Sequence, residues 1–94
     1  MRKNEQSLGE AFKQLYKKLG IEDKAAQFEV ENAWKEMIGD EIYQKTQFVK
    51  VKNNEIEIKI NSALIRQEFQ MHQTELLQKI NEKVKKNYTK IHFT

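Results

Sequence analysis

The chain has 94 residues, of which 38% are hydrophobic and 33% charged, enough for one domain with a modest core. It has no cysteine, which excludes a disulfide framework and a thiolate metal site and fits a cytoplasmic protein. The first ten residues, MRKNEQSLGE, lack the apolar stretch of a signal peptide, and no apolar run approaches the ~20 residues that cross a bilayer.

The net charge of +3 is unevenly placed along the chain. Residues 1–44 carry seven Lys/Arg against nine Asp/Glu, whereas residues 45–94 carry ten against five. A basic second half favours a polyanionic or acidic partner. Lysines that only solvate the surface give the same count, so both interpretations stay open.

The first predicted element is a helix over residues 7–19, which follows a flexible N-terminus over residues 1–6. Gly20 lies where the left-handed residue after a helix belongs. Together, residues 7–94 are expected to form a single domain. The apolar residues of this helix follow the i, i+3, i+4 rule: Leu8, Ala11, Phe12, Leu15, Tyr16 and Leu19.

A second helix is predicted from about Asp23 to Ile38, where Gly39 follows as another left-handed terminator. Its acidic start suits the positive end of the helix dipole. Trp34, the only tryptophan, shares an apolar stripe with Val30 and Met37. An aromatic side chain at helical spacing usually packs in the core, so we predict that Trp34 is a core residue.

The stretch TQFVKVKNNEIEIKIN, residues 46–61, predicts a β-hairpin. Two alternating runs flank Asn53-Asn54, and asparagine tolerates the positive φ that a type I′ turn needs. Opposite charges then meet on one face and β-branched residues on the other, which fixes the register. The predicted pairs are Lys52 with Glu55, Lys50 with Glu57, Phe48 with Lys59, Val51 with Ile56, and Val49 with Ile58.

A long third helix is predicted from Ala63 to about Lys86, with Ser62 as its N-cap and Asn87 as its left-handed end. Residues 88–93, YTKIHF, alternate again and predict a third strand with Ile91 and Phe93 on one face. The apolar seam of the helix is expected to run along Leu64, Ile65, Phe69, a half-buried His72, Leu76, Ile80 and Val84.

The predicted order is α-α-β-β-α-β, and the predicted fold class is α+β. Such an order gives a two-layer sandwich, with a three-stranded sheet covered by helices on one face. The third strand is expected to join the hairpin edge by a right-handed crossover over the long helix. The arrangement is similar to the K-homology fold, but the Gly-x-x-Gly loop with which that fold clamps nucleotides does not occur.

No residue pattern indicates catalysis. The glycines are isolated, and His72 and His92 have no metal-ligand spacing. Ser7 and Ser62 read as helix caps, and no histidine stands in a recognisable relation to either. We therefore expect no catalytic residue, no metal, no cofactor, no small-molecule substrate and no membrane partner.

Nucleic-acid binding is the better supported chemistry, because lysines make phosphate contacts without sequence preference. An aromatic ring among them could stack on a base. The candidates lie toward the end of the chain: Lys79, Lys83, Lys85, Lys86, Tyr88 and Lys90. The alternative is that lysines near the C-terminal end of a helix only interact favourably with its dipole. The hairpin adds Lys45, Lys50, Lys52 and Lys59 with Phe48, but glutamates on the opposite strand are expected to cancel several of these charges.

An ordered series of residues resembles the DciA-type family of bacterial proteins, formerly a domain of unknown function. The series is W-x4-G-x6-T from Trp34 to Thr46, the two alternating strands, L-x-R-x-E-F from residue 64, L-L-x-x-I-N from residue 76, and I-x-F from residue 91. The resemblance covers about residues 7–94, and the chain looks like the short form that consists of this module with little else.

The resemblance implies a K-homology-like domain that contacts the replicative DNA helicase and assists its loading or operation on DNA, without hydrolysing nucleotides. Some members carry an extra segment that binds DNA. This sequence stops at Thr94, so weak single-stranded or double-stranded DNA contact is expected from the lysine-rich half. Arg66 and Glu68 match the family pattern and are candidate partner contacts, or an ordinary surface pair. A stand-alone nucleic-acid binder and a module for another protein remain alternatives.

Overall fold

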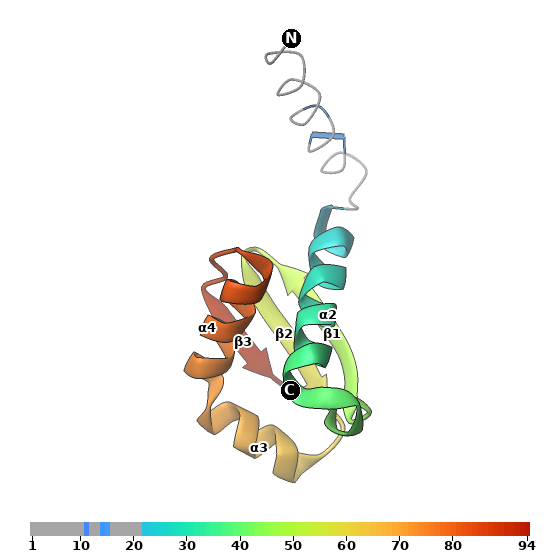
Figure 1. The fold of residues 1–94 in the computed structure, drawn as a ribbon, viewed down its shortest axis with the longest axis vertical. Coiled ribbons are helices and arrows are strands. Elements are labelled where there is room, and N and C mark those ends of the chain that lie inside the picture. The colour runs from blue at the N-terminus through green and yellow to red at the C-terminus, as the bar shows by residue number, and fades with distance from the viewer. Residues whose placement is uncertain (1–10, 12–13, 16–21) are drawn as a thin grey trace.

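The computed structural model describes residues 11, 14–15 and 22–94. The predicted helix over residues 7–19 lies almost wholly outside this part of the chain. In order, the elements are α2 (Glu22–Tyr43), β1 (Thr46–Lys52), β2 (Glu55–Ile60), α3 (Ala63–Met71), α4 (Gln73–Val84) and β3 (Lys90–Phe93) (Figure 1). In the described part, the order is therefore α-β-β-α-α-β.

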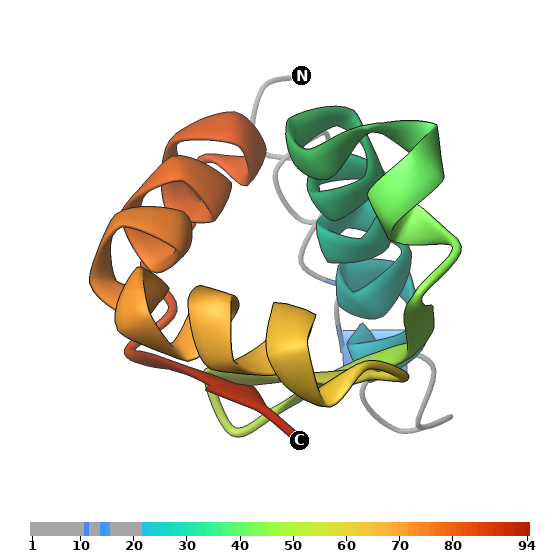
Figure 2. The same ribbon diagram turned by 90° about the horizontal axis from the view of Figure 1, so that it is seen from below.

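The strands form one mixed sheet of order β1-β2-β3. Strands β1 and β2 are antiparallel, and β3 pairs with β2 in the parallel direction. Helices α2, α3 and α4 all lie on the same face of this sheet, and the opposite face is open (Figures 1 and 2). The predicted α+β class, the single covered face and the return of the last strand beside the hairpin are confirmed.

The hairpin has the predicted register. All five expected cross-strand pairs are present, from Val49 with Ile58 to Lys52 with Glu55. Asn53 and Asn54 have φ of 53° and 66°, as a type I′ turn requires. One feature was not predicted. The register shifts between Thr46 and Phe48, which indicates a bulge at the start of β1.

The core lies between the sheet and the helices. Trp34 is fully buried, as predicted. Its ring centroid is 4.9 Å from that of Phe69 in α3 and 5.6 Å from that of Phe93 in β3. The other buried hydrophobic members of the main cluster come from α2, α4, the three strands and the loop before β3: Val30, Val49, Val51, Ile56, Ile58, Ile60, Ile80, Tyr88, Ile91 and Phe93.

Helix α2 does not end at Ile38, as predicted, but resumes after a break. Gly39 has φ 80° and ψ 162°, a conformation open almost only to glycine. The positive φ was expected, yet the chain then forms one more helical turn that reaches Tyr43. This turn is followed by Thr46, where β1 begins.

The predicted long third helix is two helices, and this prediction was wrong. His72, with φ −113° and ψ 21°, separates α3 from α4. Its side chain is 56% exposed rather than half-buried on the seam. A continuous helix would have placed the polar ring against the core. The break turns the ring outward while Phe69 and Ile80 keep their inward positions.

Helix α4 also ends earlier than predicted. Lys85, with φ 55°, is the left-handed residue, instead of Asn87. The reason lies in Asn81, whose side-chain amide donates to the Tyr88 carbonyl at 3.0 Å and accepts from the Tyr88 N–H at 2.8 Å. These two hydrogen bonds between a helix and the following loop require the chain to turn back soon after Val84.

Within the described residues, no helix is both long and apolar enough to span a membrane.

Candidate partner and nucleic-acid surfaces

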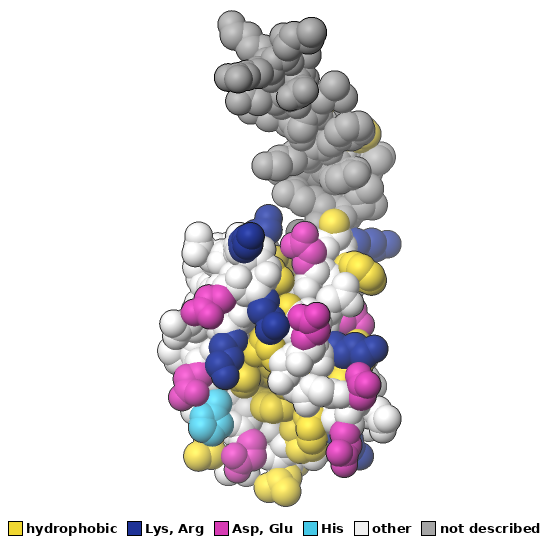
Figure 3. Space-filling view, in the orientation of Figure 1, with side chains coloured by type: hydrophobic (Ala, Val, Ile, Leu, Met, Phe, Trp, Pro, Cys, Tyr) yellow, Lys and Arg dark blue, Asp and Glu magenta, His cyan; other side chains and the backbone are white. Residues whose placement is uncertain are grey.

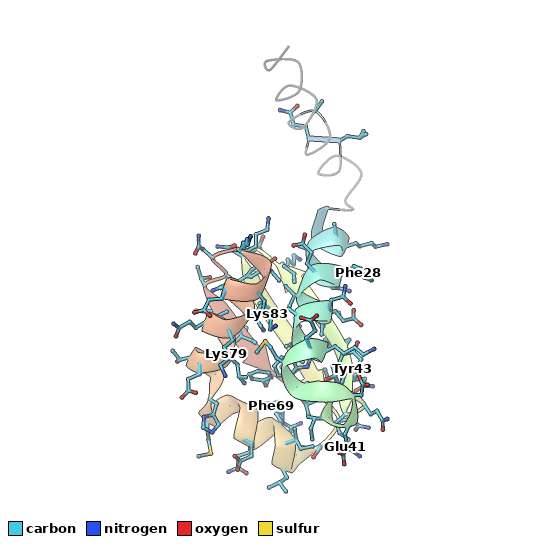
Figure 4. All side chains as sticks on the ribbon, viewed as in Figure 1. Phe28, Glu41, Tyr43, Phe69, Lys79 and Lys83 are labelled. Atoms are coloured by element: carbon cyan, nitrogen blue, oxygen red, sulfur yellow. The ribbon has the colours of Figure 1, made fainter. Side chains whose placement is uncertain are left out.

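The six residues predicted to bind nucleic acid do not form one surface. Lys79 and Lys83 lie one turn apart on α4 (Figure 4), and Lys85 and Lys86 follow its end. Lys90 begins β3 and is exposed, whereas its neighbour Ile91 is buried under the helices. Lys90 therefore points to the open face of the sheet. The structure separates the cluster into an α4 part and a sheet part.

Lys83 is engaged within the protein. Its Nζ lies 3.3 Å from Glu36 Oε2 of α2, so the pair bridges the two helices. Both side chains line a groove of about 360 Å³, together with Ala33 and Val84. Because the ion pair is largely exposed, it contributes little to stability, but a phosphate would have to compete with Glu36 for Lys83.

Lys85 and Lys86 are more accessible. Both are exposed, and both border a shallow depression of about 660 Å³ beside α4. Polar groups line much of it, including Gln78, Asn81 and Glu82. Among the described residues, neither lysine has a carboxylate within ion-pair distance. These two ammonium groups are therefore free to meet a polyanion.

Tyr88 lies in the core and not at the surface, where the prediction of base stacking requires it. It is 8% exposed and belongs to the hydrophobic core. A base stacks on the face of an aromatic ring, and that face must be open to solvent. We therefore remove Tyr88 from the candidate nucleic-acid site. The predicted alternation holds for Lys90–Phe93, but the strand does not begin at Tyr88, as predicted, and the Tyr88 ring is buried instead of sharing the face of Lys90 and His92.

The open face of the sheet has a different charge arrangement from the predicted ladder. The carboxylates of β2 are hydrogen-bonded to side chains of β3 and of the residue that follows it. His92 Nε2 lies 3.0 Å from Glu55 Oε1, and the Thr94 hydroxyl donates to Glu57 at 3.2 Å. Within the described part of the chain, Lys50 and Lys52 have no ion pair. The glutamates of β2 therefore offset the charges of Lys50 and Lys52 only as their neighbours across the strands, and no ion pair forms.

Phe48 also lies at this open face and is covered by cations. The Nζ atoms of Lys50 and Lys59 stand 4.5 Å and 6.0 Å from the centroid of its ring. Cation–π contacts of this kind contribute about 0.5–1 kcal/mol at exposed sites. A base would have to displace the lysines in order to stack on Phe48. The ring is therefore less accessible for stacking than the sequence predicted.

The two predicted partner residues, Arg66 and Glu68, face different surroundings and form no pair. Arg66 Nη1 donates to the Thr94 carbonyl at 3.5 Å, and Gln70 Nε2 donates to the Phe93 carbonyl at 3.1 Å. These bonds tie α3 to the end of β3. Glu68 is exposed and has no ion pair among the described residues. Of the two, Glu68 is the one available to a partner.

Leu64 and Met71 lie on the exposed side of α3 and are 73% and 70% exposed. The prediction that Leu64 lies on the apolar seam was therefore wrong. The inward side is formed by Ile65 and Phe69. Hydrophobic side chains at the lower end of the molecule are visible over α3 (Figure 3). The i, i+7 spacing of a leucine and a methionine was the signal that could have revealed this second, outward stripe.

Tyr43, in the turn after Gly39, is coupled to Glu31 of the same helix. Its hydroxyl donates to Glu31 Oε1 at 2.6 Å. This hydrogen bond, then burial and the negative charge of Glu31, raise the pKa of Tyr43 from 10.0 to about 12. The bond helps to hold the last turn of α2 against its longer part.

We expect Tyr43 to titrate near pH 12 in an ultraviolet absorbance titration. The folded state keeps its proton more tightly than the unfolded chain. The stability from the bond is therefore complete below pH 10.0 and is lost as the pH rises toward 12. Tyr43→Phe should remove this transition, and Glu31→Gln should shift it down. If all transitions lie near pH 10 in the parent protein, the bond is absent in solution.

Most residues of the ordered series that runs from Trp34 to Phe93 have structural roles. The indole N–H of Trp34 donates to Thr46 Oγ1 at 2.9 Å, across the turn that Gly39 opens. Phe69 and Phe93 complete the aromatic cluster, with centroids 5.3 Å apart. Asn81 holds Tyr88. The series therefore encodes mainly the fold, and only a few of its members, among them Leu64 and Glu68, are exposed at the surface.

Comparison with models of known protein families identifies this chain. A family model described as "Dna[CI] antecedent, DciA" matches residues 7–93, nearly the whole chain. No curated protein matches the chain. Among the described residues, no group of three or more His, Cys, Asp or Glu side chains is placed to hold a metal ion.

Proposed function

Since the chain belongs to the DciA family, we propose that it is a non-enzymatic adaptor that binds the replicative DNA helicase and assists its loading or operation on DNA. Membership implies a role in loading the replicative helicase in bacteria. The single observation that carries the proposal is the extent of the family match, residues 7–93. Because the match covers nearly all of the given sequence, the module over residues 7–93 is proposed to carry this function.

The module is proposed to be K-homology-like. The three-stranded sheet with helices on one face and a parallel last strand support this (Figure 2). The sequence lacks the Gly-x-x-Gly loop that clamps nucleotides in that fold. DNA contact is accordingly proposed to be weak and without sequence preference.

The proposal is tested by mixing the purified chain with its cognate replicative helicase on a sizing column at micromolar concentration. We expect the chain to elute with the helicase. Elution as two separate peaks, with no change in helicase activity on single-stranded DNA, would remove the adaptor function. Binding to DNA without binding to the helicase would instead favour the stand-alone nucleic-acid module.

We further propose that DNA contact comes from the end of α4, through Lys85 and Lys86, supported by Lys79. These side chains are exposed and have no ion pair among the described residues. Lys83 contributes less, because Glu36 holds it. Lys90 lies on the open sheet face, where Glu55 is its register partner, and contributes least.

Charge reversal of Lys85 and Lys86 to glutamate should weaken binding to a single-stranded oligonucleotide and flatten its salt dependence. Each lost phosphate contact lowers the slope of log K against log salt by about 0.7, so the double variant should lose about 1.4. Fluorescence anisotropy at several salt concentrations measures this.

The matched control makes the same charge change on the other face, with Lys50 and Lys52 changed to glutamate. The control variant should retain the greater part of the affinity. If the sheet variant loses affinity and the α4 variant does not, the DNA contact lies on the sheet, and the assignment to α4 is wrong.

A further inference from the structure

Helix α3 packs against the rest of the protein on one side only. None of its residues is buried; Ile65 and Phe69 pack against the core from the inner side. The outer side carries Leu64, Glu68 and Met71, at positions i, i+4 and i+7 of one helical face. We name these three residues the α3 stripe. Leu64 and Met71 lie about 10.5 Å apart along the helix axis, with the carboxylate of Glu68 between them.

The helix that carries the stripe is anchored at several points. Its start is capped by Ser62, whose hydroxyl accepts from the Ile65 N–H at 3.3 Å. Arg66 and Gln70 donate to backbone carbonyls at the end of β3. The stripe is therefore displayed on a fixed element, so a partner would not have to order it. Preorganised side chains lose less entropy on binding.

Two large hydrophobic side chains of the stripe are exposed on one face of the helix. Single exposed hydrophobic residues are ordinary on a protein surface. Here two large ones, 73% and 70% exposed, occupy the same face of a nine-residue helix. In helix-in-groove recognition, anchors lie at i, i+3 or i+4, and i+7. The stripe has this spacing, with apolar anchors at its two ends.

The charges around the stripe are mostly negative. Glu68 and Glu75 are exposed, and the latter lies in the first turn of α4, where its Oε1 is 3.9 Å from His72 Nδ1. Over residues 63–75 the only opposing charge with a fixed sign is Arg66, whose guanidinium is directed to the Thr94 carbonyl. The stripe therefore presents two apolar anchors in a negative setting, which is unsuited to a nucleic acid and complementary to a basic partner.

We propose that the α3 stripe docks an amphipathic helix of the replicative helicase, whose apolar face contacts Leu64 and Met71 and whose flanking lysine or arginine pairs with Glu68. This inference rests on the proposed adaptor function and adds the surface and the chemistry of the contact. A second copy of this chain is a poorer occupant. In a two-fold symmetric pairing the same patch meets itself, which would bring the two Glu68 carboxylates together at its centre.

The test measures the affinity of the full chain for the intact helicase by light-scattering or interferometry titration. The stripe variant combines Leu64→Ser with Met71→Ser, and a second variant carries Glu68→Lys. The matched control is Phe28→Ser, because Phe28 of α2 is equally exposed, at 65%, but lies far from α3 (Figure 4). All four positions are exposed, so the variants should melt like the parent protein.

The stripe variant should bind at least about a hundredfold more weakly, because each anchor that is buried on docking contributes tenfold or more. Glu68→Lys should weaken binding about tenfold at low salt and less at high salt. Phe28→Ser should stay within about twofold of the parent protein. This pattern supports the docking surface.

Three other outcomes would overturn the inference. Parent-like affinity of the stripe variant means that the helicase binds elsewhere, and the adaptor function then stands without this surface. Tighter binding by Glu68→Lys means that the partner is acidic. A parent protein that associates with itself through the stripe, but not with the helicase, means that the occupant is a second copy, and in that case the adaptor function fails as well.

Discussion

Replacing Trp34 with alanine is expected to lower the free energy of unfolding by about 3–5 kcal/mol, the range for a large aromatic side chain removed from a packed core. Trp34 is fully buried and contacts both Phe69 and Phe93. It also donates the hydrogen bond to Thr46 that joins α2 to β1. The substitution therefore removes apolar contacts from three elements at once and leaves the Thr46 hydroxyl without this donor.

Thermal and urea unfolding, followed by circular dichroism, measure the effect. Domains of this size are stable by only about 5–15 kcal/mol, so the variant should lose a large fraction of its stability and melt at a clearly lower temperature. Phe28→Ala is the control, since an exposed aromatic residue should change stability by no more than about 0.5 kcal/mol. If the Trp34 variant melts within a few degrees of the parent protein, the indole is not a core residue in solution.

Asn81→Ala is expected to lower the free energy of unfolding by about 2–4 kcal/mol. The loss of a partner costs about 1–3 kcal/mol for each fully buried polar group, and the two hydrogen bonds lost here are only partly buried. The Asn81 side chain makes two hydrogen bonds to the backbone of Tyr88, at 3.0 Å and 2.8 Å. They fix the turn between α4 and β3 and place the Tyr88 ring in the core.

Gln78→Ala serves as the control for this prediction, because Gln78 lies on the same helix and is exposed. It should unfold like the parent protein. Hydrogen exchange of the Tyr88 amide provides a second readout, which should accelerate in the Asn81 variant. Unchanged exchange and stability would show that the turn is held by other contacts.

The parts of the fold that follow from local rules could be predicted from the sequence. The hairpin register depends on a two-residue Asn-Asn loop and on alternation with a period of two, and both are written in residues 46–61. A shift of one residue would have exposed Val49 and Ile58, so only one register is compatible with burial. The core position of Trp34 follows from helical spacing in the same way.

The breaks in the helices could not be predicted, since their causes are tertiary. No proline or glycine marks the break at His72; it occurs where a continuous helix would press an imidazole against the core. The end of α4 is set by a side chain that bonds a residue seven positions later. Propensity favours Asn87 as the left-handed residue, but the contact between Asn81 and Tyr88 places that conformation at Lys85.

The candidate surfaces were predicted only in part. The sequence shows that lysines accumulate in the second half, but it does not show which face of the protein each one occupies. Lys85 and Lys86 lie at one end of the molecule and Lys90 on the open sheet face. Arg66 and Glu68 are two residues apart, and the structure directs only Glu68 to solvent without a partner in the described chain.

The two proposed surfaces lie far apart on the molecule. Helix α3 is at one end of the sheet, and the loop after α4 is at the other (Figure 1). A protein docked on the α3 stripe would therefore leave Lys85 and Lys86 uncovered. This arrangement is compatible with an adaptor that holds the helicase with one end while the other end contacts the DNA onto which the helicase is loaded.

The most direct test of the adaptor function is the loading of the cognate replicative helicase onto single-stranded DNA coated with single-stranded-DNA-binding protein. Strand unwinding is followed with and without the purified chain. We expect the chain to increase the fraction of DNA unwound several-fold, with the effect saturating as the chain is titrated against the helicase. Unwinding that is the same at every concentration of the folded chain would contradict the proposed function.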